Sequence, residues 1–354
     1  LIHFINLMKI KETMANETST EMTKKDFQFF LTKEAGATDG YSKFVTLQPV
    51  NKSKKAGYYV QMDNLSKIDW TAKVDDFDAN TVTWNYLHTF GSKKDIKSYR
   101  PNVPGLLFNK PKLQIVLKSP LLVREKYGIG SGLRQIIGTF NDPEVKKKFD
   151  DDKGQIAAAS ITNSHYSSKY EVVTKYLVYI LDMNNRRCHK TPMVLIMKGL
   201  NGVNFAEKLK DFERDMTDCL KTVTGDSTPY KMNEKFFGTC IFEPDLIYSI
   251  EGMNETQVVW IDSYTKPIYN NAEEALMWMN QLSIPAEDRA STWEDQGAFD
   301  DYINMHSLME QKDTDGAYGL APGVEVKPSD RAAALPSADA VTAEVVATGE
   351  DARL

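Results

Sequence analysis

Runs of β-branched and aromatic residues follow one another from about Phe27 onward, separated by turns rich in Asn, Asp, Gly and Ser. Such runs bounded by turn chemistry are typical of strands. Before residue 200 they predict strands over Phe44–Val50, Tyr58–Met62, Ile68–Val74, Thr81–Phe90, Leu113–Lys118, Ile156–Ile161, Tyr170–Leu181 and Thr191–Lys198.

The last two of these runs predict a long antiparallel hairpin, because only a short Asn-rich turn at Asp182–Asn185 and a few polar residues separate them. The second run contains Met193–Met197, which has no polar position that could form a solvated face. We therefore expect this strand to lie in the core.

One strongly amphipathic helix follows the hairpin. Apolar residues recur at three- or four-residue steps from Phe205 to Val223, with charged residues between them, and Asn204 is a suitable amino-terminal cap. Further strands are predicted over Phe236–Phe242, Leu246–Glu251 and Gln257–Tyr264, and a closing helix over Ala272–Leu282.

This order of elements does not alternate strand with helix, as a doubly wound α/β protein would. It predicts an α+β fold of mainly antiparallel strands, an OB-like barrel or sandwich with one long amphipathic helix inserted and a closing helix. Residues 1–26 are predicted to be a flexible lead-in, 27–285 a β-rich globular domain, and 286–354 an acidic, mostly disordered tail. Trp293, Phe299 and Tyr302 suggest that the first part of the tail docks or is transiently helical.

Composition narrows the class of protein. The 354 residues are 42% hydrophobic and 10% aromatic, which is typical of a packed core rather than a disordered chain. The odd number of cysteines, 3, favours a reducing compartment, and no apolar stretch approaches the ~18 residues of a membrane helix. We expect a soluble, cytoplasmic protein without a secretory signal, whose natural start is Met8 or Met14.

The net charge of −6 divides unevenly along the chain. Residues 286–354 hold 15 acidic and 5 basic residues, net −10, so residues 1–285 carry net +4. Residues 91–150, which we call the basic segment, hold 13 Lys or Arg against 5 Asp or Glu, net +8. A cationic region and an acidic tail in one chain favour a polyanionic partner.

The usual signatures of catalysis are absent. Gly128–Gly132 lacks the Lys-Ser or Lys-Thr pair of a phosphate-binding loop, and Cys188 and His189 are adjacent rather than spaced as metal ligands. We expect no cofactor, no metal site and no enzymatic activity. One alternative stays open. The chain could be a metal-dependent nuclease if Asp75, Asp76, Asp78 or Glu243 converge with a lysine to form its active site.

Cations and aromatic rings alternate along the basic segment. Single-strand binders need this combination, because cations contact phosphates and flat rings stack on bases; a solvated Lys-rich face is the competing interpretation. Trp70, Trp84 and Tyr86 are further stacking candidates, the last two on one face by alternation. The predicted contact residues are Lys93, Lys94, Lys97, Tyr99, Arg100, Phe108, Lys110, Lys112, Arg124, Lys126, Tyr127 and Arg134.

Three motifs carry a resemblance to a known family. They are Pro192–Phe205 with its following helix, Phe242–Asp245 and Trp260–Pro267. Over about residues 90–270 the chain resembles a family of uncharacterised proteins found in cyanobacteria, their plasmids and phages, which implies no activity. In layout it is also similar to phage and plasmid single-stranded DNA-binding proteins of the oligonucleotide-binding (OB) fold.

The leading hypothesis is a non-enzymatic single-stranded DNA- or RNA-binding protein of a phage or mobile element, with protein partners docking on the acidic tail and no membrane partner. The main alternative is a phage structural or assembly protein that associates with itself. The sequence does not decide whether the chain forms a homo-oligomer.

Overall fold

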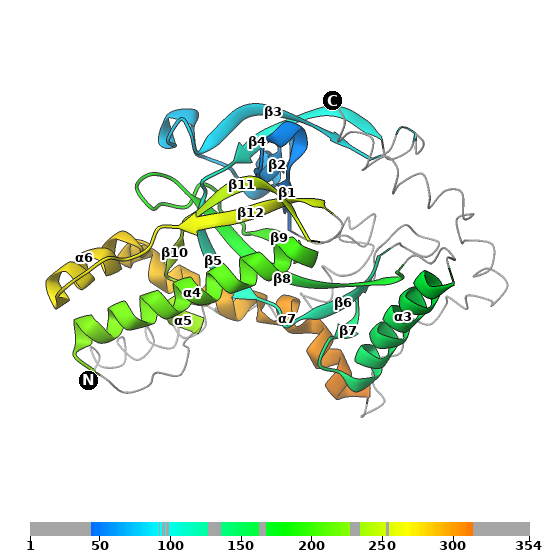
Figure 1. Cartoon of the computed structure of the whole chain (residues 1–354). Helices are drawn as coiled ribbons and strands as arrows, with labels where there is room; N and C mark the ends of the chain where they lie inside the picture. Colours follow the sequence, from blue (N-terminus) through cyan, green and yellow to red (C-terminus); the bar gives the residue numbers. More distant parts are fainter. Residues whose placement is uncertain are drawn as a thin grey trace, which may run out of the picture. The chain divides into compact units, whose positions relative to one another are not determined.

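A mostly antiparallel sheet of ten strands is the centre of the computed structural model (Figure 1). The structure describes residues 44–126 without 92, 94, 95, 97 and 98, and residues 136–162, 168–226, 234–252 and 255–313. The main strand order is β10-β5-β8-β9-β1-β2-β4-β3; off this path, β6 pairs with β8 and β7 pairs with β6. The strands are β1 (Thr46–Val50), β2 (Gly57–Gln61), β3 (Val82–Phe90), β4 (Arg100–Phe108), β5 (Lys112–Lys118), β6 (Leu122–Glu125), β7 (Ile136–Thr139), β8 (Tyr170–Leu181), β9 (Met193–Lys198) and β10 (Ile241–Phe242).

The sheet is open among the described strands, because its end strands β10 and β3 do not pair with each other. β1 and β9 pair in parallel, and the other pairs are antiparallel. A separate antiparallel ribbon consists of β11 (Pro244–Glu251) and β12 (Thr256–Tyr264). The expected α+β class with mainly antiparallel strands is therefore confirmed, but the closed OB-like barrel is not found.

β8 is buried on both faces. Its residues alternate between two apolar clusters, with Tyr176 and Val178 in one and Leu177 and Tyr179 in the other. It pairs antiparallel with β9, in the register Val173↔Lys198 to Val178↔Met193. The predicted hairpin and its core position are both confirmed, since the side chains of β9 from Met193 to Leu195 are fully buried.

The long helix α4 (Gly199–Thr224) covers one face of the sheet with Phe205, Leu209, Phe212 and Met216. The predicted helix is present, but it begins at Gly199, six residues before the expected first residue, Phe205. Asn204 lies inside it, 2% exposed, and does not cap it. Its side chain instead accepts from the backbone amide of Ile261 at 2.7 Å and donates to the same residue's carbonyl oxygen at 3.3 Å, which ties α4 to β12.

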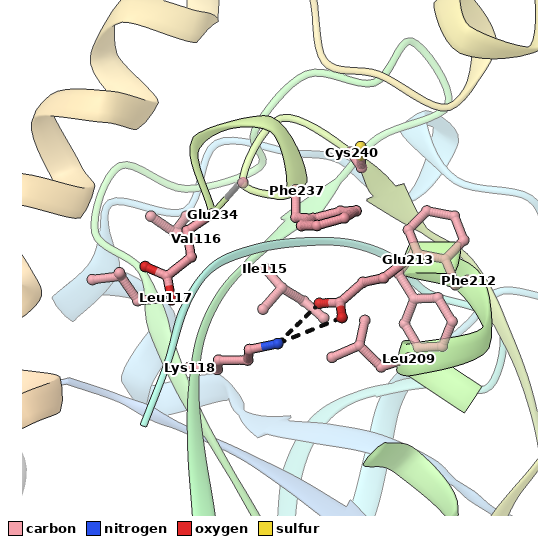
Figure 2. A pocket seen from close by; sticks show the side chains of 12 residues that line it. Ile115, Val116, Leu117, Lys118, Leu209, Phe212, Glu213, Glu234, Phe237 and Cys240 are labelled. Atoms are coloured by element: carbon pink, nitrogen blue, oxygen red, sulfur yellow. Dashed lines mark hydrogen bonds and ion pairs between the residues drawn. The ribbon is translucent and has the colours of Figure 1, made fainter. Parts of the chain in front are cut away.

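A small cavity of about 120 Å³ lies between α4, β5 and the segment that contains the short helix α5 (Glu234–Phe237) (Figure 2). We call it the α4–β5 cavity. Its walls are mostly apolar, and the Glu213–Lys118 ion pair is part of its lining. The expected strand over Phe236–Phe242 is wrong for its first half, which forms α5 and a turn, and right for β10.

The other face of the sheet is covered by α7 (Arg289–Asp313), which follows the short helices α6 (Ala272–Gln281) and η5 (Ala286–Asp288). Ile303 of α7 is 1% exposed, and Phe299 and Tyr302 contact the ring of Phe44 edge-on. The first part of the expected tail is therefore a packed helix, as Trp293, Phe299 and Tyr302 suggested. The tail from residue 314 and the lead-in 1–26 lie outside the described residues.

Two other expectations fail. Ile156–Ile161 is the end of α3 (Pro143–Ile161), and Ile68–Val74 is no strand but connects the short helices η3 (Met62–Ile68) and η4 (Val74–Asp76). The strands β4, β6 and β7 were not expected. No helix among the described residues is long and apolar enough to cross a membrane.

Candidate nucleic-acid interface

Several cations of the basic segment are paired with carboxylates from distant parts of the chain. Lys110 lies 3.7 Å from Asp245, Lys112 lies 3.4 Å from Glu243, and Arg124 lies 2.8 Å from Glu171. Lys118, in the same segment, lies 3.1 Å from Glu213. Folding thus neutralises much of the local charge excess, and these predicted contact residues have structural partners.

Glu171 shows how firmly one of these pairs is held. Burial by itself would raise the pKa of this carboxyl group, but the Lys198 and Arg124 charges outweigh burial and hold its pKa below the ordinary value. The Arg124 side chain is only 13% exposed beside it. A phosphate would therefore have to displace a buried carboxylate to reach Arg124.

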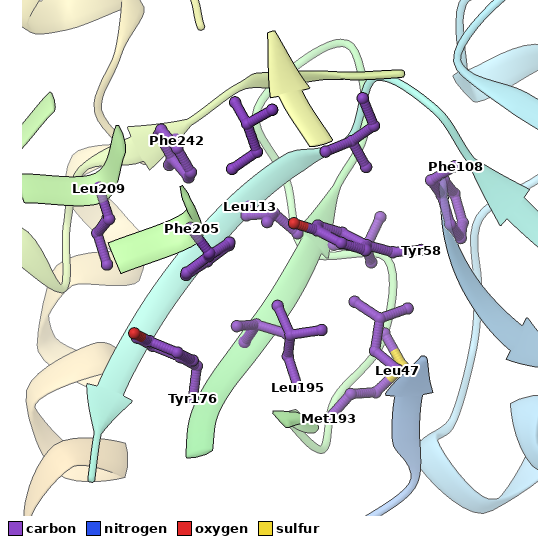
Figure 3. Packing of buried hydrophobic residues seen from close by; sticks show 14 of the residues in the cluster. Leu47, Tyr58, Phe108, Leu113, Tyr176, Met193, Leu195, Phe205, Leu209 and Phe242 are labelled. Carbon is purple, nitrogen blue, oxygen red and sulfur yellow. The ribbon is translucent and has the colours of Figure 1, made fainter. Parts of the chain in front are cut away.

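Phe108 is wrong as a stacking residue, because it is fully buried in the main core (Figure 3). Trp70 lies half-buried and stacks on Phe77 and His189, so its faces are occupied within the protein. The expected pairing of Trp84 and Tyr86 on one face is also wrong. A register shift between Thr83 and Tyr86 leaves Tyr86 7% exposed and Trp84 43% exposed.

The remaining predicted residues fall into three sets: those of the β3–β4 hairpin, Lys126, and those outside the described residues. Lys93 and Arg100 are exposed and Tyr99 is half-buried, at the end of the β3–β4 hairpin. Lys126 follows β6, with its backbone amide donating to Lys169 O at 2.7 Å. Outside the described residues lie Lys94, Lys97, Tyr127 and Arg134.

The β1–β2 turn supplies cations that lie outside the basic segment. It contains the short helix η2 (Lys52–Lys54) and Lys55, with Lys54 and Lys55 exposed. The Lys52 ammonium donates to Thr89 Oγ1 at 3.0 Å, and Tyr86 Oη donates to Lys52 O at 3.5 Å. These two bonds bring the turn against β3, although 37 residues separate Lys52 from Thr89. A Lys-Ser-Lys-Lys run between two predicted strands was visible in the sequence, but its neighbour in space was not.

Four rings form a contiguous row beside this turn: Tyr59, Tyr86, His88 and Phe90. The Tyr59 ring centroid lies 5.5 to 5.7 Å from the other three, and His88 and Phe90 are 4.6 Å apart. Tyr59 approaches β4 so closely that a Cβ at Gly105 would lie 2.4 Å from its ring, so glycine is required there. Tyr59 is fully buried, whereas His88 and Phe90 keep part of their surface exposed.

His88 is a neutral member of this row. Burial and the Lys52 charge both lower the pKa of its imidazole. Its Nδ1 atom is buried and has no hydrogen-bond partner among the described residues. Phe90 lies opposite Arg100 in the β3–β4 register, so the row ends beside an exposed guanidinium group.

The acidic residues that a metal-dependent nuclease would need do not converge in the described part of the chain. Asp76 accepts from the backbone amide of Lys73, Asp78 accepts from that of Asn80 at 2.8 Å, and Glu243 pairs with Lys112. No three His, Cys, Asp or Glu side chains gather closely enough to hold a metal ion within this described part.

Residues 42–284 match the family model of a domain of unknown function, DUF5895. The chain belongs to this family. The match confirms the resemblance to an uncharacterised family and extends it beyond both ends of residues 90–270. It ends before α7. No curated protein and no solved structure matches the chain.

Proposed function

We propose that this DUF5895 protein binds single-stranded nucleic acid on the surface formed by the β1–β2 turn and the β3–β4 hairpin. One observation carries the proposal: cations without a carboxylate partner in the described chain, all but one of them exposed, border a row of aromatic rings. We call this surface the turn–hairpin surface. Its cations are the half-buried Lys52 and the exposed Lys54, Lys55, Lys93 and Arg100.

The chemistry of this surface suits a flexible polyanion. Lysine and arginine bind phosphates, and the partly exposed rings of His88 and Phe90 offer edges and faces to unstacked bases. Trp84, 43% exposed on the same edge strand, is a further ring within the hairpin. Base contacts of this type need an unpaired strand, so we expect a preference for single strands over duplex.

The test is binding of a fluorescent 20-mer, single-stranded or duplex, to the full chain at about 50 and 200 mM salt. Five phosphate contacts give a salt slope of about −3.5 for a single strand, so affinity should fall by about 100-fold over this range. The double variant Lys54→Gln/Lys55→Gln should reduce the magnitude of the slope by about 1.4.

Two further variants separate charge from stacking. Phe90→Leu keeps an apolar side chain but removes the ring, and should weaken binding by about 1–3 kcal/mol with the salt slope unchanged. Lys110→Gln is the matched control, because Lys110 already faces Asp245 and should leave the slope unchanged. Absence of salt-dependent binding by the full chain would overturn the proposal and favour self-association instead.

A further inference from the structure

The α4–β5 cavity has a mostly apolar wall that also contains one buried charged side chain, that of Glu213. Leu209 and Phe212 of α4 and Phe242 of β10 line it, and all three are nearly fully buried. The carboxylate of Glu213 extends from α4 toward β5 among these residues (Figure 2). Its side chain is only 8% exposed.

Glu213 has fewer hydrogen-bond donors around it than a buried carboxylate can use. Its one side-chain partner among the described residues is the Lys118 ammonium, 3.1 Å and 3.5 Å from its two oxygens. A carboxylate offers about four acceptor positions, and a buried charge is costly unless these are satisfied. Lys118 itself is 45% exposed, so it shares its charge with solvent.

The charges around the cavity favour a cation. Glu213 and the exposed Glu234 both line it, whereas Lys118 is the one basic residue in its lining. An anionic ligand would face two carboxylates, but an ammonium group would add a second donor to Glu213. The volume of about 120 Å³ is slightly below that of an engineered cavity of about 150 Å³ that holds benzene.

We propose that the α4–β5 cavity binds a small primary amine with an apolar body, the size of one aromatic ring or a short alkyl chain. The ammonium group donates to Glu213, and the apolar body packs against Leu209, Phe212 and Phe242. This site is independent of the turn–hairpin surface, so nucleic-acid binding and amine binding can each fail without the other.

The test uses the full chain with three probes of nearly equal shape: benzylamine, benzyl alcohol and benzoate. Isothermal titration should give saturable binding of one benzylamine per chain, at least about tenfold tighter than benzyl alcohol, because its hydrogen bond is charge-assisted. Benzoate should bind most weakly. Thermal unfolding should show the largest rise in Tm with benzylamine.

Two variants assign the effect to Glu213. Glu213→Gln keeps the shape and should reduce the benzylamine affinity to that of benzyl alcohol. Lys118→Gln removes the competing ammonium from a largely exposed position and should tighten benzylamine binding several-fold. Glu207→Gln is the matched control, because Glu207 is exposed on the same helix and does not line the cavity.

The following outcomes of these binding experiments would contradict the proposal. Equal affinities for benzylamine and benzyl alcohol would show that the carboxylate takes no part. No saturable binding of any probe would show that the cavity accepts no ligand of this class. If Glu213→Gln fails to fold, Lys118→Gln decides alone, and unchanged benzylamine affinity in that variant overturns the assignment.

Discussion

His189 is enclosed between two aromatic rings. It is 2% exposed and stacks on Trp70 and Tyr179, with ring centroids 5.7 Å and 5.1 Å away. Its Nε2 accepts from the backbone amide of Ile180 at 3.0 Å, so the proton lies on Nδ1, 2.7 Å from Thr191 O. The imidazole thus joins two backbone segments in its neutral form.

This arrangement makes stability depend on pH. Burial lowers the pKa of His189 to about 4; the bond to Thr191 opposes this shift and the charge of Arg187 adds to it. Because the unfolded pKa is about 6.5, the unfolded chain binds a proton that the folded chain excludes. The stabilising contribution is complete above pH ~6.5 and is lost as pH falls toward 4, by roughly 3 kcal/mol.

Urea unfolding at several pH values between 7.5 and 4.5 tests this prediction with His189→Gln. The variant should be less stable at pH 7.5, because it loses part of the bonding, but its stability should fall less steeply below pH 6.5. Lys190→Gln, an exposed neighbour, should keep the full slope. Parallel curves for His189→Gln and the wild type would show that this imidazole is not the titrating group.

Among the contacts between elements, a network of polar side chains holds α7 against the sheet. Arg187 donates to Asp295 Oδ2 at 2.9 Å and to Thr292 Oγ1 at 2.9 Å, and its guanidinium lies over the Tyr179 ring. Gln114, fully buried on β5, donates to Thr292 Oγ1 and to Gly238 O. These bonds set the position of α7 along the apolar face.

Removing one partner of the Arg187–Asp295 ion pair should destabilise the protein. Asp295→Ala leaves the Arg187 side chain, only 16% exposed, without its carboxylate and should cost about 3 kcal/mol in urea unfolding. The double variant Arg187→Met/Asp295→Leu should recover much of this loss. Glu294→Ala, exposed on the same helix, should change stability by less than about 0.5 kcal/mol; an equal loss in both single variants would contradict the assignment.

Elements with a strong apolar period were predictable from the sequence, and those with polar inward positions were not. α4 and the β8–β9 hairpin follow their patterns closely. In α3 the buried positions are Val145, Asp152 and Ala159, and in α7 they include Thr292 and Gln296, so a polar residue interrupts each period. The beginning of α3 could have been found from Asp142, which caps it, and Pro143, a residue favoured at the first helical position.

The candidate site was predictable only in part, because it depends on contacts between residues that are far apart in the sequence. Charges counted along the chain do not reveal which cations pair with carboxylates far away, as Lys110 and Lys112 do with Asp245 and Glu243. Nor does the local pattern show that Lys52 lies against β3. Lys93, Tyr99 and Arg100 remain in the proposed surface, whereas Phe108 leaves it because the end of β4 that contains it is buried on both faces.

At the scale of the whole molecule, the packing of α7 divides the acidic charge of residues 286–354 into two parts. Residues 286–313 hold 8 acidic and 2 basic residues, net −6, and residues 314–354 hold 7 acidic and 3 basic residues, net −4. More of the acidic charge therefore belongs to the packed helix region than to the remainder. A deletion from residue 297 would remove Phe299, Tyr302 and Ile303 and expose the sheet face beneath them.

The competition between acidic tail and nucleic acid is best tested by removing residues 314–354, which leaves α7 complete. If these residues compete for the turn–hairpin surface, the deletion should tighten single-strand binding several-fold at about 50 mM salt and by much less at 200 mM, because screening weakens the tail's attraction. A full-length chain with the seven acidic residues of 314–354 changed to Asn or Gln is the matched control for chain length, and it should bind as the deletion does. Tightening by the deletion alone would assign the effect to bulk rather than charge, and unchanged affinity in both would exclude the tail as a competitor.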